Sequence, residues 1–412
     1  MRQPLSRDTR LLVTGQAVRG LGYGFTAVVL GDQLAARGVG ALEAGVLLAS
    51  LIAGSALMSL VVGAFADRFG RRRSYGLFFL GVAVAGVILA SDPPTWLFFV
   101  VALTGTLSTD VVDNGPATTL EQVMLATEDG GTGRVYGWYN AAGAAFGALG
   151  ALGAASVHLG SSMRGTHAML FGALVPVGLV GALAAWGLSR AVEVPRLANA
   201  RVGRTRLGPS RHVVHRLSAL FAVDAAGGGL ATASFLSYYF VSRYGVSLTA
   251  LGWLFFGVSI TQALSVLVAP LLARRFGLVE TMVGTHLPSN VLLAAMAFAP
   301  SFRLAAVLLI AKTTLSQMDV PTRQALVMSV ITPPERSQAA AVTNAARYSV
   351  RPVAPLIGGA LQSLGLGVPL LVAGVVKGGY DLALWRWARQ LGLRSREMSA
   401  RSPQRAKPEE NS

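Results

Sequence analysis

Between two apolar stretches the chain reads Gly63-Ala64-Phe65-Ala66-Asp67-Arg68-Phe69-Gly70-Arg71-Arg72-Arg73. The first apolar stretch ends at Val62 and the second begins at Leu77. Arginine is costly within hydrocarbon, so a cluster of arginines between two such stretches predicts a short turn outside the membrane. We therefore expect two membrane-spanning helices joined by a basic turn.

The rest of the chain has the composition of a membrane protein. It is 53% hydrophobic and only 13% charged, whereas soluble domains have about 25% charged residues. A hydrocarbon core about 30 Å thick needs about 20 apolar residues per helix, and stretches of this length without alternation select helices over a barrel. We expect an all-α membrane protein with twelve transmembrane helices, beginning near residues 11, 42, 74, 96, 135, 167, 216, 248, 279, 303, 338 and 366.

The distribution of positive charge predicts the orientation. The formal net charge is +16, which by itself would suggest nucleic-acid binding. However, 26 of the 35 Lys and Arg residues fall in termini and loops on one side of the predicted topology, and four fall on the other side. This asymmetry follows the positive-inside rule. It predicts a multi-pass protein with both termini in the cytoplasm and no nucleic-acid partner, and the arginine-rich composition suggests a bacterial inner membrane.

Enzymatic and metal-binding motifs are not found. The chain has no cysteine, which excludes disulfides and thiolate metal sites. None of its five histidines lies in HExxH, and no lysine follows a phosphate-binding GxxxxG. We expect no enzymatic activity, no cofactor and no metal site.

The two halves of the chain look like repeats of one plan. Ala17-Val18-Arg19 matches Ala222-Val223-Asp224 at an offset of 205 residues, and a constant offset is typical of internal repeats. A polar, arginine-rich segment separates the halves. We predict an N-terminal six-helix bundle at 1–190, a cytoplasmic linker at 191–214, a C-terminal bundle at 215–393 and a disordered cytoplasmic tail at 394–412.

The turn resembles the loop between helices 2 and 3 of the major facilitator superfamily, whose pattern is roughly G-x-x-x-D-R-x-G-R-[RK]. The matching positions form the expected gating motif: Gly63, Asp67, Arg68, Gly70, Arg71 and Arg72. The resemblance implies two pseudo-symmetric six-helix bundles, a substrate site between them near the membrane midplane, and a secondary transporter that works as a monomer by alternating access.

Charged residues within the spans are the candidates for coupling, because embedded charges usually mark functional sites. Arg19 and Asp224 occupy equivalent positions in helices 1 and 7, so we expect them to pair across the cavity, unless each pairs within its own bundle. Asp113 and Asp319 precede prolines that kink helices 4 and 10. With Asp224, they are the expected proton carriers.

Further residues are candidates for substrate contact or for ion pairs. Arg347 and Arg351 are four residues apart and would suit a carboxylate or phosphate, or acidic neighbours could neutralise them. Lys377 with Asp381 is an expected pair on one helix, and Glu121 with Arg323 is expected to bridge the halves when the inner gate closes. The complete predicted substrate-binding set is Arg19, Asn114, Asn140, Asp224, Tyr238, Tyr239, Arg347 and Arg351.

The sequence thus favours proton-coupled efflux of a drug, a metabolite or a toxic anion. One departure weakens the export prediction: the proline-rich pattern typical of drug antiporters is missing, since the stretch 140–153 contains no proline. Proton-coupled uptake of an organic anion is the alternative, and a membrane sensor without transport is another. The expected partners are a small-molecule substrate, protons and the lipid bilayer.

Overall fold

The structure is a computed structural model that describes residues 5–108, 115–129, 133–156, 170–193, 208–331 and 335–390. Within these ranges every regular element is helical, as the sequence predicts. The N-terminal half contains α1 (Arg7–Ala36), α2 (Ala41–Phe69), α3 (Arg71–Ala90), α4 (Thr95–Leu103), α5 (Pro116–Asp129), α6 (Gly133–Ala155), α8 (Leu174–Gly187) and the short 3₁₀ helix η1 (Arg190–Val192). The C-terminal half contains α9 (Arg211–Gly229), α10 (Ala233–Tyr244), α11 (Leu248–Phe276), α12 (Leu278–Met296), α13 (Phe302–Ser316), α14 (Asp319–Val330), α15 (Arg336–Val350), α16 (Val353–Gln362) and α17 (Val368–Gln390).

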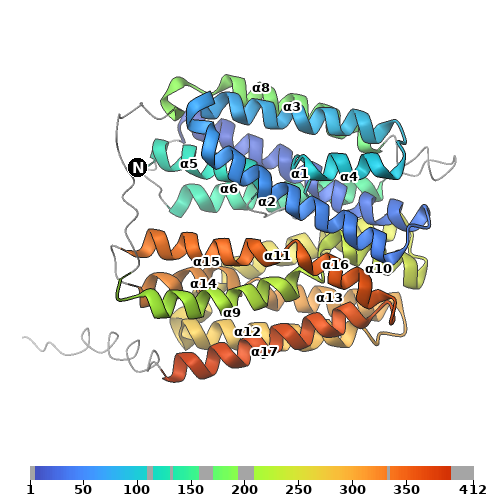
Figure 1. Ribbon diagram of the computed structural model, residues 1–412, viewed down its shortest axis with the longest axis vertical. Helices are drawn as coiled ribbons and strands as arrows, with labels where there is room; N and C mark the ends of the chain where they lie inside the picture. Colours follow the sequence, from blue (N-terminus) through green and yellow to red (C-terminus); the bar gives the residue numbers. More distant parts are fainter. Residues whose placement is uncertain are drawn as a thin grey trace, which may run out of the picture.

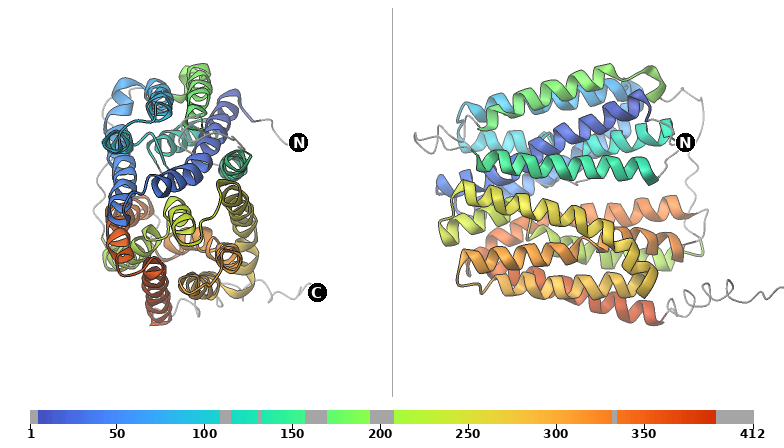
Figure 2. Two further views of the ribbon diagram at one scale, coloured as in Figure 1. Left: turned by 90° about the vertical axis from the view of Figure 1, so that its right-hand side faces the viewer. Right: turned by 180° about the vertical axis from the view of Figure 1, so that it is seen from behind.

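The two halves of the chain form two helical bundles. Figure 1 shows α1 to α8 stacked above α9 to α17, with the helix axes of both bundles roughly aligned with one another. The chain begins on the side where α17 ends, which we call the terminal side (Figures 1 and 2). The turn at Gly70 lies on the terminal side, since α1 crosses away from it and α2 returns.

The helices are consistent with twelve crossings. Several predicted spans are divided into two consecutive helices, such as α9 with α10, α13 with α14 and α15 with α16. Pro352 separates α15 from α16, because proline lacks the N–H that would continue the helix. In the part of the chain that the structure describes, six helical segments are each long and apolar enough to cross a membrane. Interruptions of this kind are tolerated at membrane depth where the backbone faces protein or a cavity.

The basic turn is as tight as the sequence suggests. Gly70 alone separates α2 from α3, with φ at +95°, and Gly277 separates α11 from α12 in the same way, with φ at +103°. Side chains other than glycine rarely adopt such angles. The carboxylate of Glu193 accepts hydrogen bonds from the backbone N–H groups of Arg71 at 2.8 Å and Arg72 at 3.2 Å. This contact satisfies free donors at the start of α3.

The two bundles meet mainly on the side opposite the termini. There α1 packs on α10, α2 on α16 and α6 on α11. Ser234 Oγ donates to the carbonyl of Ala27 at 3.2 Å, and Ser237 Oγ donates to the carbonyl of Val28 at 3.0 Å. Gly45 lies directly against the backbone of Gly359. These contacts close the molecule on the side away from the termini.

Glycine allows the closest helix contact in the N-terminal bundle, between α1 and α6. A Cβ atom at Gly150 would lie 2.0 Å from the carbonyl oxygen of Leu21, whereas a Cβ at Gly153 would meet no atom within 4 Å. Small residues allow this approach of two backbones in a membrane.

We predict that Gly150→Ala destabilises the protein by about 1–3 kcal/mol, the usual cost of overpacking, because two backbones would have to separate. Gly153→Ala is the matched control on the same helix and should leave stability unchanged or slightly raised. Thermal unfolding of both variants in detergent checks this. Equal melting temperatures for the two variants would contradict the packing described.

Candidate functional site

A cavity of about 260 Å³ lies between the bundles and is lined almost entirely by the C-terminal half. Helices α9 to α15 and α17 contribute its polar and charged side chains. Of the described residues in the N-terminal half, Gly24 and Ala27 from α1 and Ala151 from α6 line the cavity. These side chains of the N-terminal half are small and apolar. Recognition of a ligand therefore depends on the polar and charged side chains of the C-terminal half.

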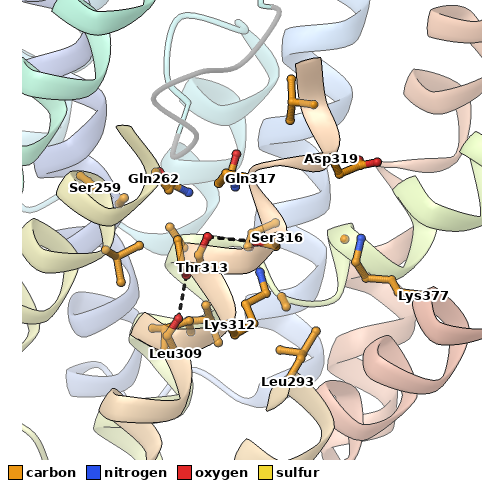
Figure 3. Close-up of a pocket in the computed structure, with 18 of the residues that line it drawn as sticks. Ser259, Gln262, Leu293, Leu309, Lys312, Thr313, Ser316, Gln317, Asp319 and Lys377 are labelled. Carbon is orange, nitrogen blue, oxygen red and sulfur yellow. Dashed lines mark hydrogen bonds between the residues drawn. The ribbon is translucent and has the colours of Figure 1, made fainter. Parts of the chain in front are cut away.

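Uncharged polar groups line part of the cavity. Ser259 and Gln262 come from α11, and Thr313, Ser316 and Gln317 come from α13 and its end (Figure 3). The Thr313 hydroxyl donates to the carbonyl of Leu309 at 2.8 Å.

Positive charge exceeds negative charge around the cavity. Among the described residues, its lining includes five cationic side chains, Lys312, Arg323, Arg347, Arg351 and Lys377, and two carboxylates, Asp224 and Asp319. Figure 3 shows Lys312 and Lys377 on helices at different sides of the same space. Cations gathered at low dielectric attract an anion far more strongly than they would in water.

Asp224 connects several of these cations. Its carboxylate contacts Lys377 Nζ through one oxygen and lies 3.4 Å from Arg323 through the other. Arg323 also bonds Asp319, one turn earlier on α14, at 2.5 Å. His286 Nε2 lies 3.8 Å from Asp224. All of these groups are nearly buried, so the network depends on mutual neutralisation.

Lys312 and Arg347 differ from the other cations. Within the described part of the chain, neither makes an ion pair, and Arg347 Nε is a buried nitrogen without a hydrogen-bond partner. Arg347 was expected at the site from its spacing with Arg351, which also lines the cavity. Lys312 was not in the substrate-binding set predicted from the sequence, although a lysine within a span is a sufficient signal.

Arg19 does not lie at the cavity. It is 2% exposed and bonds Glu121 at 2.7 Å inside the N-terminal bundle. Tyr75 and Tyr139 donate to the same carboxylate. The expected pair of Arg19 with Asp224 is therefore wrong in this structure, and the alternative of pairing within each bundle is the one observed.

One other expected pair is also wrong. Lys377 contacts Asp224, whereas Asp381 bonds His286, because the two side chains of α17 face different neighbours. Glu121 and Arg323 each bind a partner in their own half. Their contact was expected when the inner gate closes, so it stays a prediction.

Besides Arg19, three other predicted substrate residues lie away from the cavity lining. Tyr238 and Tyr239 are buried, and their hydroxyls donate to the carbonyls of Val39 at 3.1 Å and Met296 at 3.2 Å. Tyr238 thus holds the two bundles together, and Tyr239 holds α10 to α12. Asn140 is exposed on α6.

Some predictions cannot be compared with the structure. Asp113 and Asn114 lie outside the described residues, and so does the tail at 394–412. In the gating motif, Gly63 and Asp67 lie within α2. The structure does not describe the surroundings of these two residues. Arg68 is exposed in the last turn of α2, Arg71 is buried and Arg72 is half-buried. The gating role of these residues stays a prediction.

The family is decided by comparison with known sequences. The sequence model of the Major Facilitator Superfamily matches residues 12–355. The chain belongs to the Major Facilitator Superfamily. An uncharacterized membrane protein of Saccharomyces cerevisiae is 25% identical over 396 residues, covering 87% of this chain and 88% of the yeast protein.

Solved structures of superfamily members share the fold. The D-xylose-proton symporter has a TM-score of 0.71 at 14% identity, covering 91% of this chain and 97% of its own. The nucleoside transporter NupG has a TM-score of 0.68 at 14% identity, covering 92% and 97%. The human organic anion transporter MFSD10 has a TM-score of 0.61 at 17% identity, covering 93% and 100%. The chain is thus a multi-pass membrane protein with a transporter fold, and its family consists of transporters of small molecules.

We predict that Glu121→Gln destabilises this superfamily member by about 3–5 kcal/mol, because Arg19 would remain buried without its counter-ion. Thermal unfolding in detergent measures the effect. The control is Asp92→Asn, which removes the partly exposed partner of Arg37 and should cost at most about 1 kcal/mol. A small effect at both positions would show that the Arg19 cluster contributes little to stability.

Proposed function

We propose that the chain is a secondary active transporter that carries a small organic anion by alternating access, coupled to protons. The observation that supports this most directly is the excess of cations around the cavity, with Lys312 and Arg347 lacking ionic partners in the described chain. A buried cation without a partner costs several kcal/mol. A carboxylate or phosphate bound between them would offset that cost, and arginine offers such groups two parallel donors.

The cavity volume argues for a small solute. At 260 Å³ it is below the range of about 300–1,000 Å³ typical of drug-sized ligands. A cationic drug would also meet the repulsion of five positive side chains. The substrate class that fits best is therefore a small organic anion, one of the classes expected from the sequence.

The network at Asp224 supports coupling of the anion to a proton. Asp224 holds Lys377 and Arg323, so a bound anion competes with Asp224 for the same cations. A proton that enters this network weakens the hold of Asp224 and frees the cations for the anion. Each ligand then favours binding of the other. Because proton binding and anion binding favour each other, the two ligands would move in the same direction. This favours proton-coupled uptake, the alternative predicted from the sequence, over efflux, which was the first prediction.

The topology completes the proposal. We place the terminal side in the cytoplasm of a bacterial inner membrane, because basic residues concentrate there. The bundles are closed on the other side by Ser234, Ser237 and Tyr238, so the cavity would face the cytoplasm. The units would be the bundles at 1–190 and 215–393, the linker at 191–214 and the tail at 394–412, acting as a monomer with the motif from Gly63 to Arg72 at the inner gate.

Anion binding is tested in liposomes with benzoate, succinate and glycerol 3-phosphate, using choline and glucose as cationic and neutral comparisons. We expect at least one anion to be carried. Lys312→Gln and Arg347→Gln should each weaken its binding by about 1–3 kcal/mol, the loss of a hydrogen bond to a charged group.

The matched control is Arg303→Gln, which removes an exposed cation from the same helix as Lys312 and should bind the anion normally. Transport of choline with no anion transport would overturn the proposal. Anion binding without any movement would favour the sensor.

Cavity orientation is tested with introduced cysteines, since the chain has none. We predict that an impermeant thiol reagent labels Gln262→Cys, in the cavity, much faster from the terminal side. Leu364→Cys, 76% exposed beyond α16, should label from the opposite side. Vesicles of both orientations provide the comparison. Faster labelling of Gln262→Cys from the side of Leu364 would exclude the orientation proposed.

A further inference from the structure

His286 on α12 lies between two carboxylates at the edge of the cavity. Its Nδ1 is 2.8 Å from Asp381 Oδ1, and its Nε2 is 3.8 Å from Asp224 Oδ1. The imidazole is 3% exposed and is the one histidine among the residues that line the cavity. It was not among the candidate residues from the sequence, because it belongs to no motif.

The orientation of the ring is fixed by its neighbours. Asp381 accepts a second hydrogen bond from Asn290 Nδ2 at 2.8 Å, and the ring of Tyr380 packs edge-on against the imidazole with centroids 6.0 Å apart. An ionised carboxylate only accepts hydrogen bonds. Nδ1 therefore carries a hydrogen that it donates to Asp381, and in the neutral ring Nε2 is the site open to a proton.

The position of Nε2 makes this site sensitive to Asp224. A separation of 3.8 Å is too long for a hydrogen bond, but a proton on Nε2 would create a donor directed at the Asp224 carboxylate. The charged and titratable groups around the ring come from all the neighbouring helices except α11, which presents the uncharged Ser259 and Gln262. They are Asp224 of α9, Lys312 of α13, Asp319 and Arg323 of α14, Arg347 of α15, and Lys377, Tyr380 and Asp381 of α17.

We propose that His286 is the group that holds the coupling proton, an inference that rests on the proposed function. The proton is taken from bulk water onto Nε2 and is later returned from the same atom, with no other bond broken. The imidazolium then bridges Asp381 and Asp224 and draws the Asp224 carboxylate away from Lys377. Lys377 and Arg323 become available to the anion, and loss of the proton restores their pairing.

The predicted carriers fit this role less well than His286. Asp224 and Asp319 are both bound to Arg323, which is always charged and favours the ionised carboxylate. The ion-pair contacts of His286 are with two carboxylates, Asp381 at 2.8 Å and Asp224 at 3.8 Å. Histidine is also the side chain whose unperturbed charge change falls between pH 5 and 8.

A measurement without substrate tests the proton site directly. We would label the histidines of the full chain with ¹³C and follow them by NMR in nanodiscs from pH 4 to 9. The resonance missing from His286→Gln identifies His286, and we expect a pH-dependent change of that resonance with a single midpoint, which reports proton uptake by the ring. Asp381→Asn should move this midpoint to lower pH, because the imidazolium loses a counter-ion. A signal that does not titrate, or an unchanged midpoint in Asp381→Asn, would overturn the inference.

Transport separates this inference from the proposed function. In liposomes, His286→Gln should reduce anion-driven proton uptake about tenfold, a typical coupling, while exchange of labelled for unlabelled anion continues. His215→Gln, an exposed histidine on α9, receives the same substitution and should behave as wild type. Anion transport by the wild type without proton movement would refute the proposed coupling. Wild-type proton movement that persists in His286→Gln would refute only the role of His286.

Discussion

The carboxylate of Asp224 holds together much of the C-terminal bundle. It joins α9 to α14 through Arg323 and to α17 through Lys377, and it lies within ion-pair reach of His286 on α12. Four helices thus share one buried negative charge. Because a buried charge left alone is strongly destabilising, any motion that separates these helices must provide a new partner. That requirement ties the conformation of the bundle to whatever ion occupies the cavity.

The two halves use the same ion pair with opposite polarity. In the N-terminal half the first helix supplies the cation, Arg19, and α5 supplies the anion, Glu121. In the C-terminal half α9 supplies the anion, Asp224, and α14 supplies the cation, Arg323. The N-terminal pair is sealed by Tyr75 and Tyr139, whereas the C-terminal pair opens onto the cavity. The duplicated plan therefore provides one structural pair and one pair available to ligands.

The sequence predicts the architecture well, since long apolar stretches and the glycine turn at Gly70 are local signals. It predicts ion pairs poorly. The repeat correctly placed Arg19 and Asp224 at equivalent positions, but equivalence does not say whether partners lie within a bundle or across the cavity. The prediction that Tyr238 and Tyr239 contact substrate did not match the structure for a similar reason. A tyrosine in a span can bind either a ligand or a backbone carbonyl, and the packing of α10 determines which of the two it binds. His286 has no pattern in the sequence, because its partners lie 62 residues earlier and 95 residues later in the chain.

Where the structure describes the N-terminal half, the residues that face the cavity are Gly24, Ala27 and Ala151. A ligand bound to the C-terminal half would keep its contacts while the N-terminal bundle moves relative to it. The free-energy cost of that movement would therefore depend little on which ligand is bound. Divergence of selectivity among descendants of this chain would then require substitutions in one half only. The other half could keep its sequence as a common partner for many substrates.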